Sequence, residues 1–339
     1  MSKGDENMRA KELANSLNKL LGEDTVVMGN TIKIERLPTG ILPIDYILDG
    51  GLPKNRFVEV YGDYSTLKSY IAYKAIAETQ KNNGTTCLID TEHSFDPQWA
   101  SSLGVNVDDL MYITPQNGEE AVDVTEVLLR EKIDLIVWDS VAALLPQSEE
   151  DKREKGVNHQ PARLAALMSK GLRKLTAANS ETAVLMINQT RLNVGQIFGN
   201  PETVPGGKSL PFYAAYRLSL RKAGKETTTV DIWDGEKTVK SNQISVQKIK
   251  VKIEKSKMSK PYSEVFFDFN LEAGEIDELA FIISVGLSND LILREGTRKW
   301  KIATEEKGII GYQNFKEYLM KDKKKIASLR KKIINLSGK

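Results

Sequence analysis

Cysteine and histidine are nearly absent from this sequence of 339 residues, which contains Cys87, His93 and His159 and no others of either type. A single cysteine cannot form an intrachain disulfide, and so few soft ligands argue against a structural zinc site. Cys87 lies inside an apolar run. We therefore expect a buried thiol in a protein of a reducing compartment.

Long hydrophobic runs are also missing. No uninterrupted apolar run approaches the roughly 20 residues of a membrane-spanning helix, and the polar first residues do not resemble a signal peptide. Hydrophobic residues make up 40% of the chain and charged residues 28%, which is typical of a globular protein. We expect a cytoplasmic protein without membrane contact, long enough for one large domain and a smaller one.

The formal net charge is only +2, but it is unevenly distributed. Residues 316–339 contain nine Lys or Arg and two Asp or Glu, so the remaining residues sum to −5 (+2 minus +7). A basic segment at one end favours contact with a polyanion through that end. The alternative is the solvated face of a terminal helix.

Short apolar strands alternate with helices over most of the chain. The pattern predicts strands over 56–61, 86–90, 133–138 and 183–187, and helices over 70–81, 119–131 and 161–178. This alternation is typical of a mostly parallel sheet covered by helices on both faces. From about residue 214, strands with polar interruptions (214–221, 244–253 and 263–270) indicate antiparallel additions at one edge.

Three parts follow from this pattern. Residues 1–34 are expected to hold an amphipathic helix over 8–22 and a linker. Residues 35–270 are expected to form the α/β core. Residues 271–339 are expected to form a small mixed domain that ends in a lysine-rich helix.

The segment after strand 56–61 has the chemistry of a phosphate-binding loop, and it consists of Gly62, Asp63, Tyr64, Ser65, Thr66, Leu67, Lys68 and Ser69. In such a loop, backbone N–H groups wrap phosphates, the lysine contacts β/γ oxygens and the hydroxyl binds Mg²⁺. The full pattern has glycine at position 67. Leucine must therefore keep a negative φ or turn its side chain away from the nucleotide. The alternative is an ordinary strand–turn–helix with a surface lysine.

Polar residues also end three other predicted strands. Glu92 follows strand 86–90, Asp139 follows strand 133–138, and Gln189 follows strand 183–187. The carboxyl ends of parallel strands meet at the ligand crevice. Glu92 could polarise a water, Asp139 could hold Mg²⁺ through water, and Gln189 could sense a γ-phosphate. Each alone could also be a helix-capping residue.

Together these segments resemble the RecA family of homologous-recombination ATPases of the bacterial type, including phage-encoded members. The likeness rests on residues 37–40, 45, 50–53, 90–97, 139–144, 187–189, 198–203 and 206–207. It covers about residues 35–260 and continues more faintly beyond them. The run 198–207 is the most specific part, because a generic nucleotide-binding fold does not need it.

The resemblance implies a RecA-type P-loop ATPase core, with ATP and Mg²⁺ as cofactors. It implies a recombinase that forms helical filaments on single-stranded DNA and exchanges strands with double-stranded DNA. Its further expected partners are single-strand-binding and loader proteins. By the same resemblance, Glu92 would orient water, and Gln189 would couple the γ-phosphate to a DNA loop.

The resemblance assigns further ligand contacts. Asp96 and Trp99 would lie near the adenine, and Lys255 and Lys257 would reach the ATP of a neighbouring subunit. A solvated strand edge guarded by lysines is the alternative for that pair. Phe212 resembles a subunit-interface residue, with core packing as its alternative.

Two loops are expected to contact DNA, one over about 149–163 and one over 191–207. The candidate DNA contacts are Arg163, Arg191, Ile197, Phe198, Gly199, Asn200, Gly206, Gly207 and Lys208. Backbone amides and basic side chains would bind phosphates without reading sequence. Ile197 and Phe198 could wedge between bases or pack against the sheet.

The sequence departs from the family pattern in three places. Leu67 replaces a glycine, and Ala165 stands where the family uses an arginine for DNA. The C-terminus is basic where many bacterial members are acidic, which predicts stronger duplex capture. The rival functions are an ATP-binding recombination mediator with little hydrolysis, which only Leu67 favours, and a RecA-fold ATPase without DNA.

Overall fold

The computed structural model describes residues 3–22, 25–147, 161–192, 202–233 and 238–337. The chain divides into two compact units, Met1–Glu35 and Arg36–Lys339. The first contains α1 (Lys3–Leu21) and a short turn, Gly29–Thr31. The Asn18 side chain bridges to Val26, accepting from its N–H at 2.7 Å and donating to its carbonyl at 2.8 Å. The predicted helix is confirmed, and it begins five residues earlier than expected.

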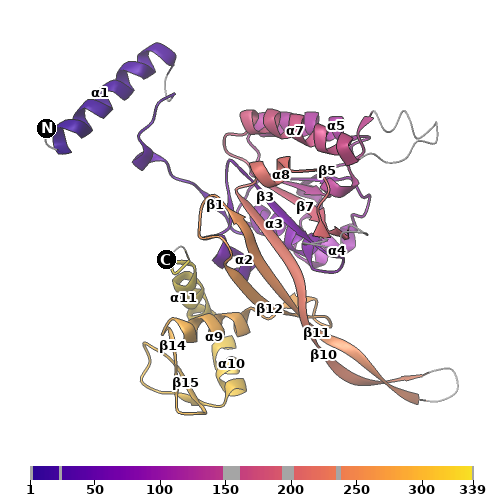
Figure 1. The fold of residues 1–339 in the computed structure, drawn as a ribbon. Helices are drawn as coiled ribbons and strands as arrows, with labels where there is room; N and C mark the ends of the chain where they lie inside the picture. Colours follow the sequence, from indigo (N-terminus) through magenta and orange to yellow (C-terminus); the bar gives the residue numbers. More distant parts are fainter. Residues whose placement is uncertain (1–2, 23–24, 148–160, 193–201, 234–237, 338–339) are drawn as a thin grey trace. The chain divides into compact units, whose positions relative to one another are not determined.

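A nine-stranded sheet is the centre of the second unit, among the residues that the structure describes (Figure 1). Its order is β13-β12-β11-β10-β3-β7-β6-β4-β5. The strands are β3 (Arg56–Gly62), β4 (Thr86–Asp90), β5 (Leu110–Ile113), β6 (Leu135–Asp139), β7 (Ala183–Gln189), β10 (Tyr216–Trp233), β11 (Thr238–Ser256), β12 (Glu264–Asn270) and β13 (Glu275–Ile276). Strands β10 to β5 run parallel, and β11 to β13 add antiparallel. The predicted fold class is confirmed.

Helices cover both faces of this sheet, and β6 shows why. Leu135 and Val137 point into a core with α3 (Lys68–Lys81), whereas Ile136 and Trp138 point into a second core with α5 (Gly118–Arg130) and α7 (Pro161–Ala178). A strand buried on both faces is apolar without alternation. The shorter elements of this part are α2 (Leu42–Ile47), α4 (Pro97–Ser102), α8 (Ser209–Tyr213), β1 (Arg36–Leu37), β2 (Leu52–Pro53), β8 (Arg191–Leu192), β9 (Glu202–Thr203) and the turns Val107–Asp109 and Val141–Ala143.

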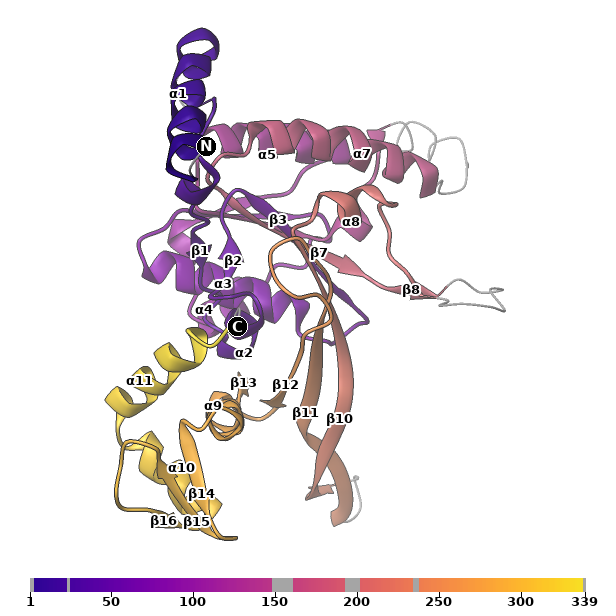
Figure 2. The ribbon, with the colours of Figure 1, turned by 60° about the vertical axis from the view of Figure 1, so that its left-hand side comes forward.

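Strands β10 and β11 are much longer than the sequence predicts. Their antiparallel register continues from Tyr216↔Ser256 to Trp233↔Thr238. Residues 216–220 of β10 pair with β3, and residues 246–252 of β11 pair with β12. Residues 227–233 and 238–244 therefore form a two-stranded ribbon beyond the other strands (Figure 2). The predicted limits, 214–221 and 244–253, were wrong because a ribbon exposed on both faces has no apolar alternation to reveal it. Residues 234–237 lie outside the described part.

The C-terminal residues form a small sheet and three helices. They are β14 (Ile292–Glu295), β15 (Lys299–Ile302), β16 (Ile309–Ile310), α9 (Glu278–Ser288), α10 (Tyr312–Met320) and α11 (Lys323–Ile334). Phe315, Leu319, Leu329 and Ile333 are buried between them. The predicted lysine-rich helix is α11. The division at residue 271 stays a prediction, because the contacts group Arg36–Lys339 as one unit.

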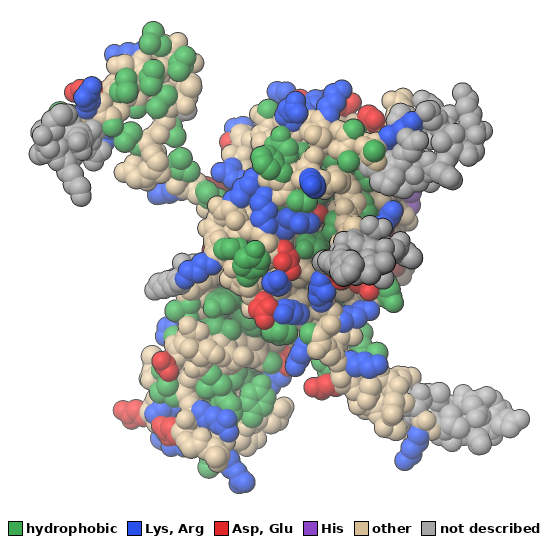
Figure 3. Space-filling view, viewed as in Figure 1, with side chains coloured by type: hydrophobic (Ala, Val, Ile, Leu, Met, Phe, Trp, Pro, Cys, Tyr) green, Lys and Arg blue, Asp and Glu red, His purple; other side chains and the backbone are tan. Residues whose placement is uncertain are grey.

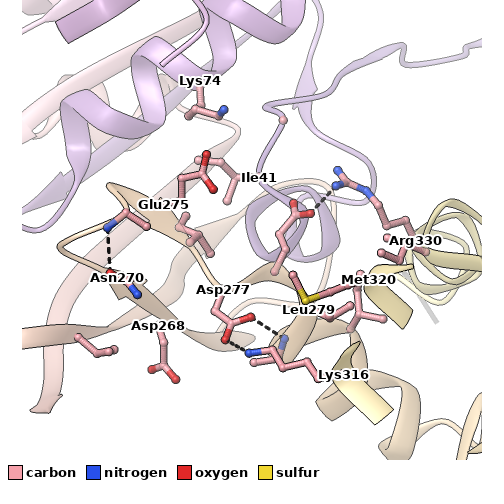
Figure 4. Close-up of a pocket in the computed structure, with 18 of the residues that line it drawn as sticks. Ile41, Lys74, Asp268, Asn270, Glu275, Asp277, Leu279, Lys316, Met320 and Arg330 are labelled. Atoms are coloured by element: carbon pink, nitrogen blue, oxygen red, sulfur yellow. Dashed lines mark hydrogen bonds and ion pairs between the residues drawn. The ribbon is translucent and has the colours of Figure 1, made fainter. Parts of the chain in front are cut away.

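A pocket of about 1240 Å³ lies between α3, β12 and the C-terminal helices. Ion pairs join Lys316 to Asp277 and Arg330 to Glu278 at its wall (Figure 4). The Glu278 carboxylate also accepts the N–H of Leu42 at 2.9 Å, which ties α9 to the start of α2. These contacts fasten the C-terminal helices to the core.

The structure also bears on membrane-spanning helices, on Cys87 and on the surface charge. Within the described ranges, no helix is both long and apolar enough to cross a bilayer. Cys87 is buried, and burial raises its pKa to about 12, so the predicted buried thiol is confirmed. On the face shown in Figure 3, Lys and Arg side chains of the second unit are interspersed with Asp and Glu.

Candidate nucleotide site

The candidate loop runs from the end of β3 to the start of α3, between strands that crowd it. A Cβ on Gly62 would lie 2.4 Å from the carbonyl oxygen of Leu220 in β10, so this position requires glycine. Thr66 is buried and donates to the carbonyl of Asp63 at 2.8 Å. Asp63 in turn accepts the N–H of Tyr64 at 2.8 Å. The loop therefore has a fixed shape in which Ser65 also takes a positive φ of 53°.

Leu67 adopts the left-handed conformation, with φ 69° and ψ 23°. The first alternative from the sequence, a negative φ, is wrong. The backbone keeps the conformation that suits glycine, at a cost of about 1–2 kcal/mol for a residue with a Cβ. The half-buried side chain packs against the apolar core on the α3 face of the sheet, and this packing offsets the strain.

Leu67→Gly should therefore be more stable than Leu67→Ala, although alanine is the larger residue. Both variants lose the packing of the side chain, but only alanine keeps a Cβ in the left-handed conformation. The unfolding free energy of the glycine variant should therefore be higher by about 1 kcal/mol. Denaturant unfolding without nucleotide measures the difference. An alanine variant more stable than the glycine variant would contradict the left-handed conformation.

Lys68 and Ser69 open α3 and face the end of β6. The Lys68 ammonium donates to the loop carbonyls of Gly62 at 3.1 Å and Asp63 at 2.7 Å. Burial lowers its pKa, and the charges of Asp139 and Glu92 oppose that shift. The Ser69 hydroxyl donates to the Asp139 carboxylate at 2.9 Å.

Asp139 is a buried carboxyl group at the end of β6. Burial raises its pKa to about 6, with the nearby charges of Glu92 and Asp90 adding to the effect, while the Ser69 hydrogen bond opposes it. A desolvated carboxylate beside a hydroxyl is a donor set that fits Mg²⁺. Among the described residues, no group of three or more His, Cys, Asp or Glu is placed to hold a metal. A magnesium ion here would complete its shell with phosphate and water.

Asp139→Asn should stabilise the nucleotide-free protein at pH 8. Because the pKa of the folded state is raised from 3.8 to about 6, the stability linked to protonation is present below pH 3.8 and lost as the pH rises through 6. The gain in unfolding free energy should be on the order of 2 kcal/mol at pH 8 and should shrink toward pH 4.

Asp134→Asn is the matched control with the opposite sign. Burial tends to raise the pKa of Asp134, but hydrogen bonds from Lys54 and Thr85 outweigh it, and the pKa is lowered. That variant should lose stability at pH 8. Thermal unfolding across pH 4–8 measures both, and a destabilised Asp139→Asn at pH 8 would refute the assigned direction.

Glu92 joins the ends of three strands. The Gln189 side-chain amide at the end of β7 donates to Glu92 Oε1 at 2.6 Å, and the Ser140 hydroxyl donates to the same oxygen. Ser140 is held in turn by Thr91, whose hydroxyl donates to the Ser140 carbonyl at 2.6 Å. Ser140 is thus a site residue that was not predicted from the sequence. Its position directly after a strand-end aspartate is the signal that could have shown it.

Two candidate adenine contacts lie at the start of α4. Asp96 caps this helix, accepting the N–H groups of Gln98 at 2.8 Å and Trp99 at 3.2 Å. The Trp99 side chain is 43% exposed and lies edge-on to Tyr73, with ring centroids 5.1 Å apart. Part of the Trp99 side chain is thus open to a ligand. Tyr64, in the loop itself, is 76% exposed beneath the Lys222 ammonium.

Lys255 lies near the end of β11 and Lys257 follows directly after that strand, and the ammonium groups of both lie against α8. The Lys255 ammonium donates to the carbonyls of Phe212 at 2.9 Å and Ala214 at 3.1 Å, at the C-terminal end of that helix. The Lys257 ammonium lies 5.3 Å from the centre of the Phe212 ring. Phe212 is 67% exposed, which contradicts the core-packing alternative for it.

The candidate DNA contacts are only partly within the described residues. Arg191 pairs with Thr203 across β8 and β9, and Gly206 and Gly207 follow with φ of 93° and 72°. A Cβ on Gly207 would lie 2.7 Å from the Cβ of Ala165, so the small residue at 165 lets this turn approach α7. Arg163 is half-buried on α7, and Lys208 is exposed. Ile197, Phe198, Gly199, Asn200 and residues 148–160 lie outside the described part.

Asn188 is a second residue near the site whose role was not predicted from the sequence. It is buried, and its amide donates to Glu59 at 3.1 Å and to the Pro205 carbonyl at 3.0 Å. Glu59 forms a buried ion pair with Arg217 of β10. The residue before Gln189 thus fastens the end of the second loop to the sheet.

A strand–loop–helix with a Lys-Ser pair, facing a carboxylate at the end of a parallel strand, defines the P-loop class of α/β nucleotide-binding proteins. Residues 10–275 match the model of the RecA N-terminal domain. The chain belongs to the RecA family, and its fold and relatives make it a RecA-type recombinase.

Three relatives, each named Protein RecA, show how far the similarity extends. The Mycoplasma mobile protein is 36% identical over 97% of this chain and 96% of its own length. The protein of Caldanaerobacter subterraneus subsp. tengcongensis is 37% identical over 97% and 93%. The Acinetobacter baumannii protein is 39% identical over 86% and 82%. The similarity includes the C-terminal residues.

Proposed function

We propose that this chain is a DNA-dependent ATPase that forms helical filaments on single-stranded DNA and catalyses homologous pairing and strand exchange. One observation carries the proposal beyond family membership. Glu92, the candidate hydrolytic carboxylate, is hydrogen-bonded directly to Gln189, from which the second candidate DNA loop follows. A contact between a carboxylate at the phosphates and the base of a DNA loop is what coupling of hydrolysis to DNA requires.

The site residues would divide the chemistry between them. Lys68 would exchange its bonds to the loop carbonyls for bonds to the β- and γ-phosphate oxygens, and Glu92 would orient the attacking water. Ser69 and Asp139 would hold Mg²⁺, which supplies positive charge to the phosphates. Gln189 would exchange its bond to Glu92 for one to the γ-phosphate and so report nucleotide state to the loop.

Contacts between subunits and with DNA complete the proposal. Lys255 and Lys257 would leave the carbonyls of α8 to bridge the ATP of a neighbouring subunit. Arg191, Lys208 and the glycines of the second loop would bind phosphates of single-stranded DNA. Exposed lysines on α11 (Lys323, Lys324, Lys331 and Lys332) favour double-stranded DNA as a second ligand. Single-strand-binding and loader proteins are proposed as further partners.

Leu67 supports a second candidate function. A strained left-handed leucine in the phosphate loop suits an ATP-binding recombination mediator in which the loop is not optimised for hydrolysis. The contact of Glu92 with both Gln189 and Ser140 favours the ATPase instead.

ATP hydrolysis with and without single-stranded DNA separates the two candidates. The recombinase predicts strong stimulation by single-stranded DNA, together with ATP-dependent binding of that DNA. A duplex-binding arm at two salt concentrations tests the contribution of the α11 lysines. ATP-dependent single-strand binding without hydrolysis would transfer the assignment to the mediator, and an absence of DNA binding would refute both.

A further inference from the structure

Asp90 is a buried carboxylate at the end of β4 to which the proposed function assigns no role. Its Oδ1 accepts the N–H of Glu92 at 2.9 Å, and its Oδ2 accepts the N–H groups of Ser94 at 2.9 Å and Phe95 at 3.0 Å. The Tyr112 hydroxyl from β5 donates to the same Oδ2 at 3.1 Å. One side chain with 1% exposure therefore fixes the backbone of the loop after β4.

This loop connects two parts of the candidate site. Glu92 stands at its beginning, and at its end Asp96 caps α4, which carries Trp99. The loop is too short to have a core of its own, so its shape depends on the carboxylate beneath it. His93 even takes a positive φ of 53° within it. A movement of α4 would therefore also displace the segment between Glu92 and Asp96, whose backbone Asp90 binds.

A row of aromatic rings links Trp99 back to the same carboxylate. Trp99 lies edge-on to the buried Tyr73, and Tyr73 lies edge-on to Phe95, with centroids 5.1 and 6.0 Å apart. Phe95 stacks on Tyr112, with centroids 4.8 Å apart and planes 28° apart. Tyr112 donates to Asp90. A continuous series of contacts therefore leads from Trp99 through these rings to Asp90, and from Asp90 to the backbone of Glu92.

We propose that Asp90 and Tyr112 are a positioning pair that couples occupancy of the base subsite at Trp99 to the placement of Glu92. The inference rests on the proposed nucleotide site. A base stacked on Trp99 would restrain the rings, and the restrained Tyr112 would hold Asp90 and its three backbone donors in place. Burial and the charge of Asp90 raise the pKa of Tyr112, so its hydroxyl stays a donor at neutral pH.

Tyr112→Phe isolates the hydroxyl, because phenylalanine keeps the ring that stacks on Phe95. The first readout is hydrogen exchange of the amides of Glu92, Ser94 and Phe95, with ADP and with inorganic pyrophosphate. In the parent protein, ADP should slow this exchange about fivefold more than pyrophosphate, the effect of one hydrogen bond. In the variant, the two ligands should have equal effects.

The second readout is steady-state ATP hydrolysis. The variant should lose about fivefold in kcat with little change in KM, since the base contact remains while Glu92 is less well placed. Met111→Leu, at the neighbouring position of β5, is the control and should leave both readouts unchanged. Retained discrimination between ADP and pyrophosphate in Tyr112→Phe, or none in the parent, would overturn the proposal. A parent protein without hydrolysis would instead refute the proposed function, and the exchange experiment would still decide the inference.

Discussion

Glu92→Gln should abolish ATP turnover while the protein still binds ATP and single-stranded DNA. Glutamine has nearly the same size but cannot take a proton from water, and general-base catalysis is worth about 10²–10⁴ in rate. The remaining carbonyl oxygen of the amide can still accept from both Gln189 and Ser140, so the variant should keep the local structure of the site. We expect kcat to fall at least about a hundredfold, with ATP affinity within a factor of about three.

The variant should still bind ATP and single-stranded DNA but should not hydrolyse the ATP. Its complex with DNA should therefore dissociate more slowly than that of the parent when ATP is present. Steady-state hydrolysis and the dissociation rate from single-stranded DNA measure the two effects. Glu78→Gln is the control, because Glu78 lies in the last turn of α3, at the opposite end of the helix from Lys68. This variant should behave as the parent. A variant that keeps more than about a tenth of the parent kcat would remove Glu92 from the catalytic role.

Lys68→Ala should have the larger effect on binding, because the Lys68 ammonium lies at the carbonyls of the loop in which the phosphates would bind. This ammonium is half desolvated beside Asp139 and Glu92, so it would meet phosphate charge in a medium of low polarity. Loss of such a charge-assisted contact in the transition state costs about a thousandfold in kcat/KM. ATP-dependent binding of single-stranded DNA should be lost with it.

Lys74→Ala is the matched control, since Lys74 lies on the same helix and donates to the Leu103 carbonyl at 3.4 Å, away from the loop. It should retain kcat/KM within about twofold, as expected for a surface substitution. Isothermal titration with ATP and a hydrolysis assay test both variants. Equal losses in the two variants would show a general defect of α3 rather than a phosphate contact.

The residues that the sequence predicted best are those with a local signal. Apolar runs predicted β3, β4, β6 and β7. The loop motif after the first run predicted Lys68, and the polar residues at the ends of the other three predicted Glu92, Asp139 and Gln189 at one edge. The structure brings these four together because all four strands are parallel neighbours. Parallel order converts a one-dimensional pattern into a three-dimensional site.

Contacts between distant residues had no such signal. Asn188 meets Glu59 across 129 positions, and Tyr112 meets Asp90 from another strand. The register that makes these pairs is decided by packing of the whole sheet, not by any local run. The negative φ offered as one alternative for Leu67 was wrong for a different reason. Its left-handed backbone is tolerated because tertiary packing outweighs a local preference.

The strand order also has a consequence for synthesis of the chain. β3 lies between β7 and β10, and its pairing of Gly62 with Leu220 joins residues that are 158 positions apart (220 minus 62). At about 5–20 residues per second, the ribosome takes on the order of 10–30 s to deliver the second partner. During that time an apolar strand and the phosphate loop beside it lack their final neighbours. Nascent chains of this protein should therefore depend on chaperones until β10 emerges, and synthesis rate should affect its yield more than that of proteins with local pairing.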